Sequence, residues 1–258
     1  RARDWDTPRV GVSVLVVRVL IGEDFSPWTE KALWALQWHG VEHDFVQFQP
    51  LIDEPWLRLK TGNFSEKATV PVLIDGGDVL GDSFAIATWA ERVGSGPALW
   101  PAGREAEVEA WNATSEKALR AGRALFFARF LEDSDAQLDQ VPAIVPGALR
   151  PLLRPVVRSA VSYLRTKHGA TTEGARAALD DALGRLRGSL AGGHLLGELS
   201  YADVAMAVVC QFVRPVDDRW IRLSPATRRC WTEESLAEKY RDVIAWRDEL
   251  YARHRRRR

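Results

Sequence analysis

A buried strand that runs directly into a helix is the feature that most constrains the fold of this chain. The run from Val14 to Ile21 is almost entirely β-branched residues and leucine, which is typical of a strand buried on both faces. Ser26 and Pro27 then suit the N-cap and the first position of a helix, whose apolar stripe includes Leu33 and Leu36. A helix N-terminus presents free N–H groups and about half a positive charge. The junction therefore predicts a site that stabilises an anion, such as a thiolate, beside Ser26.

Strand and helix patterns alternate in the sequence up to a glycine- and proline-rich linker. Residues 43–48 predict a second strand, parallel to the first. Residues 68–80 predict a hairpin around an Asp-Gly-Gly turn, followed by a helix that Asp82 or Ser83 would cap. This order predicts an α/β domain over residues 15–94.

Pro71 stands inside an apolar run of the predicted hairpin, where proline would remove a ladder hydrogen bond. A cis peptide bond between Val70 and Pro71, at the end of a strand, would account for this position and could shape a binding edge. An ordinary edge-strand proline is the alternative interpretation.

Strand signals disappear beyond the linker, and long helical patterns predict an all-α domain over residues 104–253. The segment 131–169 is atypical because it is rich in proline and arginine. Arg150, Arg154 and Arg158 recur there every four residues among apolar ones. Such a stripe would suit an anionic membrane surface or a lid over an acidic ligand, although a solvated helix face is its commonest meaning.

Composition excludes several classes of function. Lys plus Arg and Asp plus Glu both number 35, so no nucleic-acid partner is expected. Cys210 and Cys230 are the only cysteines and have neither metal-ligand nor disulfide-framework spacing, which predicts no metal, inert thiols and a reducing, cytoplasmic location. Arg18 interrupts the longest apolar run, so no transmembrane segment is expected.

The order of these motifs resembles that of the cytosolic glutathione transferase family. Ser26-Pro27-Trp28-Thr29-Glu30-Lys31 resembles the active-site segment of its Ser/Cys-type classes. Val70-Pro71-Val72-Leu73 resembles the segment whose cis-proline precedes the hairpin, and Asp82-Ser83 the acidic-Ser pair that holds the γ-glutamyl end of glutathione. The resemblance covers roughly residues 15–251. It implies a thioredoxin-like glutathione-binding domain, an all-helical domain and a possible homodimer with a role in detoxification.

The resemblance also assigns roles to five residues. The Ser26 hydroxyl would donate a hydrogen bond to the sulfur of glutathione, the co-substrate, and so act in catalysis. The main chain of Val70, before cis-Pro71, would pair with the cysteinyl part. Ser83 and nearby N–H groups would bind the γ-glutamyl carboxylate, while Asp82 would face the ammonium group. Plain helix caps are the alternative for Ser26, Asp82 and Ser83.

Three aromatic residues are candidates for the second-substrate pocket. Trp28 is expected to border the cleft because it stands beside Ser26. Phe126 and Tyr163 would form a wall for an apolar co-substrate if the segment 131–169 borders the cleft as well.

Serine rather than cysteine at position 26 disfavours thiol-disulfide reductase activity, since a hydroxyl cannot form a mixed disulfide. The leading hypothesis is an enzyme that adds the glutathione thiolate to a small apolar electrophile. A non-catalytic binding or interaction protein with the same fold is the alternative. A glutathione-dependent isomerase of the maleylacetoacetate type is less favoured, because the Ser-Ser-Cys-x-Trp-Arg pattern of those enzymes is absent.

Overall fold

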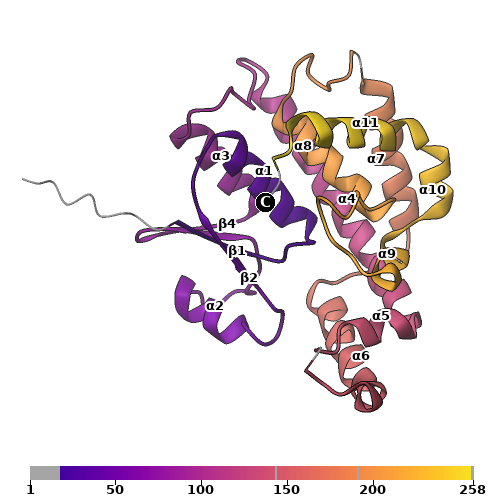
Figure 1. Cartoon of the computed structure of the whole chain (residues 1–258). Coiled ribbons are helices and arrows are strands. Elements are labelled where there is room, and N and C mark those ends of the chain that lie inside the picture. The colour runs from indigo at the N-terminus through magenta and orange to yellow at the C-terminus, as the bar shows by residue number, and fades with distance from the viewer. Residues whose placement is uncertain (1–17, 143, 191, 257–258) are drawn as a thin grey trace, which may run out of the picture.

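The computed structural model describes residues 18–142, 144–190 and 192–256 (Figure 1). The beginning of the predicted first strand, residues 14–17, lies outside the described residues. Within the described part, strands and helices mix up to Val93 and only helices follow. The predicted fold class is therefore confirmed: a thioredoxin-like α/β domain precedes an all-α region. In these ranges, no helix is both long and apolar enough to cross a membrane.

Four strands form one mixed sheet in the order β2-β1-β3-β4. They are β1 (Arg18–Gly22), β2 (Asp44–Gln47), β3 (Val72–Asp75) and β4 (Asp78–Gly81). β1 pairs parallel with β2 and antiparallel with β3, and the predicted turn joins β3 to β4 as a hairpin. The parallel pair confirms the predicted strand-helix-strand unit.

The strand β1 is buried on both faces, as its sequence predicts. Leu20 and Ile21 are fully buried but point to opposite faces, because successive side chains in a strand alternate. Leu20 belongs to the core beneath α1 (Pro27–Trp38) and α3 (Ser83–Val93), whereas Ile21 packs toward α2 (Glu54–Thr61). Figure 1 shows α1 and α3 on one side of the sheet and α2 on the other.

The helical region is built around α4 and α8. In chain order its elements are α4 (Glu105–Glu132), α5 (Ser134–Asp139), the 3-10 helix η1 (Gly147–Leu149), α6 (Arg150–Lys167), α7 (Ala175–Ser189), α8 (Tyr201–Ala207), the 3-10 helix η2 (Val208–Phe212), α9 (Pro225–Trp231), α10 (Glu234–Lys239) and α11 (Arg241–His254). Every residue of α8 is buried. A capping box begins it, in which the Ser200 N–H donates to Asp203 Oδ2 at 2.9 Å.

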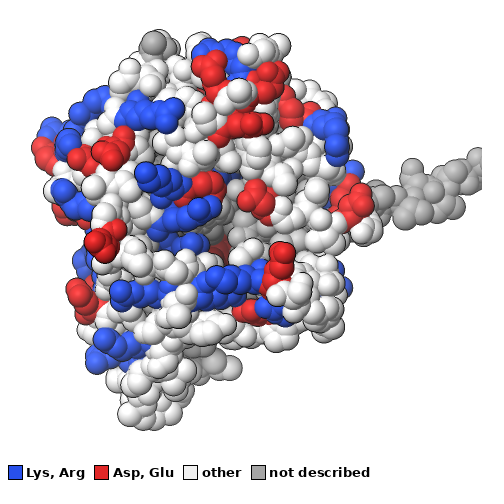
Figure 2. Space-filling model, turned by 180° about the vertical axis from the view of Figure 1, so that it is seen from behind, with Lys and Arg blue, Asp and Glu red and all other residues white. Residues whose placement is uncertain are grey.

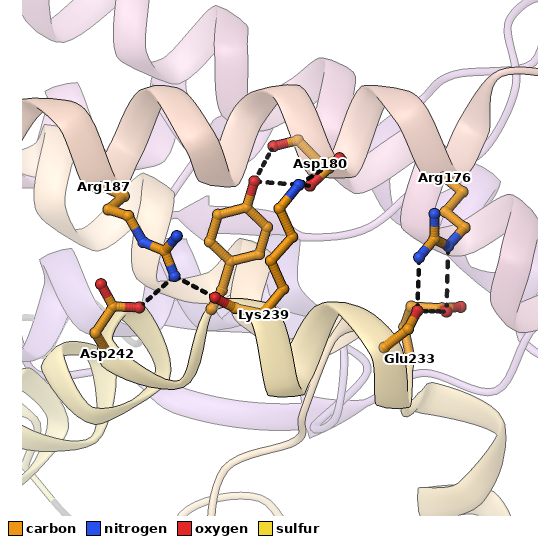
Figure 3. A network of polar contacts seen from close by, with 8 residues as sticks. Arg176, Asp180, Arg187, Glu233, Lys239 and Asp242 are labelled. Atoms are coloured by element: carbon orange, nitrogen blue, oxygen red, sulfur yellow. Dashed lines mark hydrogen bonds and ion pairs between the residues drawn. The ribbon is translucent and has the colours of Figure 1, made fainter.

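The last helical pattern of the sequence, over residues 235–253, is divided at Tyr240. The Tyr240 hydroxyl donates to Asp180 Oδ1 of α7 at 2.7 Å, and Lys239 Nζ lies 2.6 Å from the same oxygen. Figure 3 shows that Arg187 of α7 also reaches Asp242. These contacts hold α7 against both α10 and α11. Sequence periodicity does not reveal that the helix is interrupted at Tyr240, because the interruption coincides with tertiary contacts.

The α/β domain and the helical region share one continuous core. Trp34 of α1 packs edge-on against Tyr251 of α11, with ring centroids 4.7 Å apart. Lys31 Nζ, also on α1, lies 2.6 Å from Glu116 Oε1 of α4. The helix that begins beside Ser26 is therefore held from both sides.

Candidate active site

Ser26 occupies the N-cap position of α1, as predicted, but its side chain does not cap the helix. Its backbone is extended (φ −72°, ψ 127°), and its carbonyl accepts the Glu30 N–H at 2.9 Å. The hydroxyl makes no hydrogen bond to the first turn. Pro27 follows at the first helical position, where a missing N–H costs nothing. The Ser26 hydroxyl is thus available to a ligand at the positive end of a helix.

The Val70–Pro71 peptide bond is cis, as the sequence predicted. It lies immediately before β3, whose pairing with β1 begins at Val72 opposite Ile21. Val70 is not one of the paired residues of this ladder. Among the described residues, its main chain makes no backbone hydrogen bond to a turn, loop or helix cap either. Its polar groups can therefore pair with an extended ligand in the manner of an added strand.

Asp82 and Ser83 open helix α3. The Asp82 carboxylate accepts the N–H groups of Phe84 and Ala85 at 2.7 and 3.3 Å, so Asp82 provides the predicted cap. Asp82 holds an unusual positive φ of 79°. Ser83 is 1% exposed and faces Tyr201 of α8. Burial is the largest of the causes that raise the pKa of the Tyr201 hydroxyl well above its usual value, so Tyr201 stays neutral beside Ser83.

The five predicted site residues line one cavity of about 1030 Å³ between the α/β domain and the helical region; they are Ser26, Val70, Pro71, Asp82 and Ser83. Trp28 lines it too, as predicted. Three segments far apart in the sequence therefore meet where β1 and β4 end and β3 begins. The arrangement offers a hydroxyl at a helix terminus, a free strand edge and a second helix start.

Comparison with known proteins identifies the arrangement. Residues 25–93, which include all five of these residues, match the family model of the glutathione S-transferase N-terminal domain. Residues 25–93 thus form a domain of the glutathione S-transferase N-terminal type. A probable glutathione S-transferase of Solanum tuberosum is 27% identical over 117 residues, which make up 45% of this chain and 46% of that protein. The match thus spans about half the length of this relative.

Solved structures share the glutathione transferase fold over nearly their whole length. The β-etherase LigF from Sphingobium sp. strain SYK-6 has a TM-score of 0.60 at 18% identity, covering 92% of this chain and 96% of that one. The glutathione S-transferase CsGST63524 of Ceriporiopsis subvermispora, solved in complex with glutathione, has a TM-score of 0.57 at 18% identity, with 92% and 94% covered. At such identities the likeness concerns the fold alone.

In this transferase fold the atypical segment 131–169 borders the cavity through α6. Its half-buried Val157, Val161 and Leu164 line the cavity, and Arg150 does so at the start of the helix. Arg150 Nη2 donates to the Val141 carbonyl at 2.7 Å, so it holds α6 in place. The three predicted arginines do not form one surface along the cavity, because Arg154 and Arg158 are not among its lining residues.

Aromatic side chains form a further part of the cavity wall. Phe126, Phe127 and Phe130 of α4 line the cavity together with Phe212 and Trp231. Phe126 was expected there. Tyr163 was not correctly placed, since it is 51% exposed and outside the lining. The helical phase of α6, set by contacts that the sequence does not show, turns Tyr163 outward.

Charged residues that sequence analysis missed also line the cavity. Burial raises the pKa of the Glu23 carboxyl to about 7, against the opposing charge of Arg123. Burial and the neighbouring Arg120 lower the pKa of Arg123 to about 10. His168, at the end of α6, has its pKa lowered to about 4 by burial and by Arg123. Glu23 stands three residues before Ser26, which was the only available sequence signal.

Thr29 and the two cysteines are buried within the protein. Thr29 is fully buried beneath the end of β1, where a side chain on Gly22 would collide with it. Burial raises the pKa of both Cys210 and Cys230 to about 11, which agrees with the prediction that neither thiol is reactive. The described residues contain no cluster of three His, Cys, Asp or Glu side chains suited to a metal.

Proposed function

We propose that this chain is a glutathione transferase that brings the glutathione thiolate to a small electrophile with an apolar body. The observation that carries the proposal is the position of Ser26. Its hydroxyl is not used by the helix it precedes, and it faces a cavity shared with cis-Pro71 and Ser83. The solved complex of the Ceriporiopsis subvermispora transferase with glutathione supports the choice of thiol.

The residues around the cavity suit the parts of glutathione in order. The Ser83 hydroxyl and the N–H groups that begin α3 would bind the γ-glutamyl carboxylate. The Val70 main chain would pair with the cysteinyl peptide, which brings the sulfur toward Ser26. The Asp82 carboxylate, although it caps α3, keeps lone pairs for the γ-glutamyl ammonium group.

Thiolate stabilisation would be the main contribution of the protein to the reaction. The Ser26 O–H donates a hydrogen bond to the sulfur, and the terminus of α1 adds its positive potential. The sulfur then forms a bond to an electrophilic carbon, and the displaced group leaves with its electron pair. Serine does not act as the base, because its own pKa is far too high. Phe126, Phe130 and Trp231 would pack against the apolar part of the electrophile.

Glutathione binding is the first test, and calorimetric titration of the whole chain measures it. The proposal predicts binding at or below the millimolar concentrations found in cells, and conjugation of an aromatic halide electrophile by the same preparation. Binding without conjugation would favour the non-catalytic alternative. A lack of binding would overturn the proposal.

The homodimer, the cytoplasmic location and the role in detoxification stay predictions of the family resemblance. The isomerase remains the weaker alternative. The fold similarity to a β-etherase supports the testing of electrophiles in which the bond that breaks joins carbon to oxygen.

A further inference from the structure

Arg123 of α4 is a cation inside the cavity that has no hydrogen-bonded partner within the described part of the chain. Its guanidinium lies over the indole ring of Trp28, 4.7 Å from the ring centroid. Its Nε is buried and finds no acceptor among the described residues. A buried donor left unpaired costs roughly 1–3 kcal/mol, and more when it belongs to a charged group. Such a group in a cavity wall indicates that a ligand supplies the missing acceptor.

The acidic groups near Arg123 do not supply it. Glu116 is already engaged, because it accepts hydrogen bonds from Lys31 at 2.6 Å and from the Trp28 indole at 3.0 Å. Glu23 faces Arg123 but has its pKa raised to about 7 by burial, so it is partly protonated at neutral pH. Arg120, one turn earlier on α4, adds a second positive charge.

Two other cations of the cavity, Lys167 and Arg150, are used by the protein itself. Lys167 Nζ binds Glu54 at 2.8 Å and the Ala68 carbonyl at 3.0 Å. Arg150 donates to Val141. Figure 2 shows Lys and Arg side chains gathered around a hollow on the face of the molecule opposite to that of Figure 1. Arg123 therefore adds an uncommitted guanidinium to a cavity that is already positive on one side.

We propose that the second substrate carries a carboxylate, which accepts hydrogen bonds from Arg123 while its apolar body lies against Phe126 and Phe130. This inference rests on the proposed function. A guanidinium fork matches a carboxylate in shape and can donate two parallel hydrogen bonds. Arg123 and the two phenylalanines lie on one helix, spaced by one and two turns, and all line the cavity. The ligand is thus an acid with an aromatic or aliphatic body.

The γ-glutamyl carboxylate of glutathione is a poorer partner for Arg123, because in the proposed function it binds at the start of α3, in the α/β domain. Arg123 comes from the helical region and stands next to the aromatic wall. The position of Arg123 therefore suits a carboxylate of the co-substrate rather than the γ-glutamyl carboxylate of glutathione.

Two glutathione conjugates that differ only in charge provide the test. S-carboxymethylglutathione carries a carboxylate beyond the sulfur, and S-carbamoylmethylglutathione carries a neutral amide of the same shape. Calorimetry should show the wild-type chain binding the carboxylate about tenfold or more tightly than the amide at fixed ionic strength. Arg123→Gln should remove this difference and leave the affinity for glutathione itself unchanged.

Lys117→Gln is the matched control, because Lys117 is exposed on the same helix, carries the same charge and does not line the cavity. It should keep the preference for the carboxylate. Equal binding of the two conjugates by the wild-type chain would overturn the inference while the proposed function stands. Loss of affinity for glutathione in Arg123→Gln would also overturn it, since Arg123 would then serve glutathione. Failure of the wild-type chain to bind glutathione would overturn both proposals.

Discussion

Lys31 Nζ of α1 lies 2.6 Å from Glu116 Oε1 of α4, with the lysine side chain fully buried and the glutamate 19% exposed. The Asn112 side chain accepts a second hydrogen bond from Lys31 at 3.0 Å. Glu116 in turn accepts the Trp28 indole N–H at 3.0 Å. Burial alone would raise the pKa of Glu116, but the charge and hydrogen bond of Lys31, the Trp28 hydrogen bond and the Arg120 charge together lower it below its usual value. This pair joins the helix of Ser26 to the helix of Arg123.

Lys31→Met should lower the free energy of unfolding by about 3 kcal/mol, because it leaves a largely buried carboxylate without its main partner. Urea denaturation of the whole chain measures this. Lys239→Met is the control, since Lys239 also lies 2.6 Å from a carboxylate but is 52% exposed. Its loss should be much smaller. Equal losses would show that burial of the Lys31 pair contributes nothing.

The ionisation of Glu23 should make stability depend on pH. The folded protein binds the Glu23 proton more tightly than the unfolded chain does, because burial raises its pKa from 4.5 to about 7. The ionised side chain therefore destabilises the fold, progressively from about pH 4.5 and fully above about pH 7. Glu23→Gln should gain up to about 3 kcal/mol over the wild type across this window. Parallel stability curves for the two proteins from pH 4.5 to 8 would contradict the account.

Gly122 allows α4 to approach η2. A Cβ at this position would lie 2.4 Å from the ring of Phe212, whereas nothing stands within 4 Å of a Cβ on Gly188 of α7. Gly122→Ala should lower the free energy of unfolding by about 1–3 kcal/mol through overpacking. Gly188→Ala should be neutral or slightly stabilising, since alanine favours a helix. Thermal unfolding compares the two variants, and a neutral Gly122→Ala would show that the wall formed by Phe212 can move.

The parts of the site that depend on local backbone could be predicted from sequence. Pro27 favours a helix start at Ser26, Pro71 in an apolar run favours a cis peptide bond, and Asp82 favours a cap; each acts on its own neighbours. The resemblance of these motifs to those of one family then predicted that they meet. The strand β1, which precedes Ser26, was predicted from its run of β-branched residues and leucine.

The charged half of the site depends on tertiary packing and could not be predicted in this way. Arg123 was one of several charges on a long helix, and only the packing of α4 against α1 turns it toward Trp28. Glu23 gained its raised pKa from burial by residues distant in sequence. Tyr163 was misplaced for the same reason, because the sequence does not define which face of α6 meets the cavity.

Ser26→Cys should convert the site to thiol chemistry. The introduced thiol at the helix terminus should ionise readily and attack oxidised glutathione, forming a mixed disulfide and releasing one reduced glutathione. Mass spectrometry of the intact protein detects the adduct. The wild-type chain should remain unmodified, because burial raises the pKa of Cys210 and Cys230 to about 11. An adduct on the wild type would contradict this account of its thiols.

The ionisation of bound glutathione tests the central role of Ser26 most directly. Thiolate absorbance, followed against pH in the complex with the wild-type chain, should give a thiol pKa about one unit or more below that of free glutathione. Ser26→Ala should return the thiol pKa toward the free value and lower the conjugation rate roughly a hundredfold or more. An unshifted thiol pKa in the wild-type complex, or the same pKa and rate in Ser26→Ala, would contradict the account.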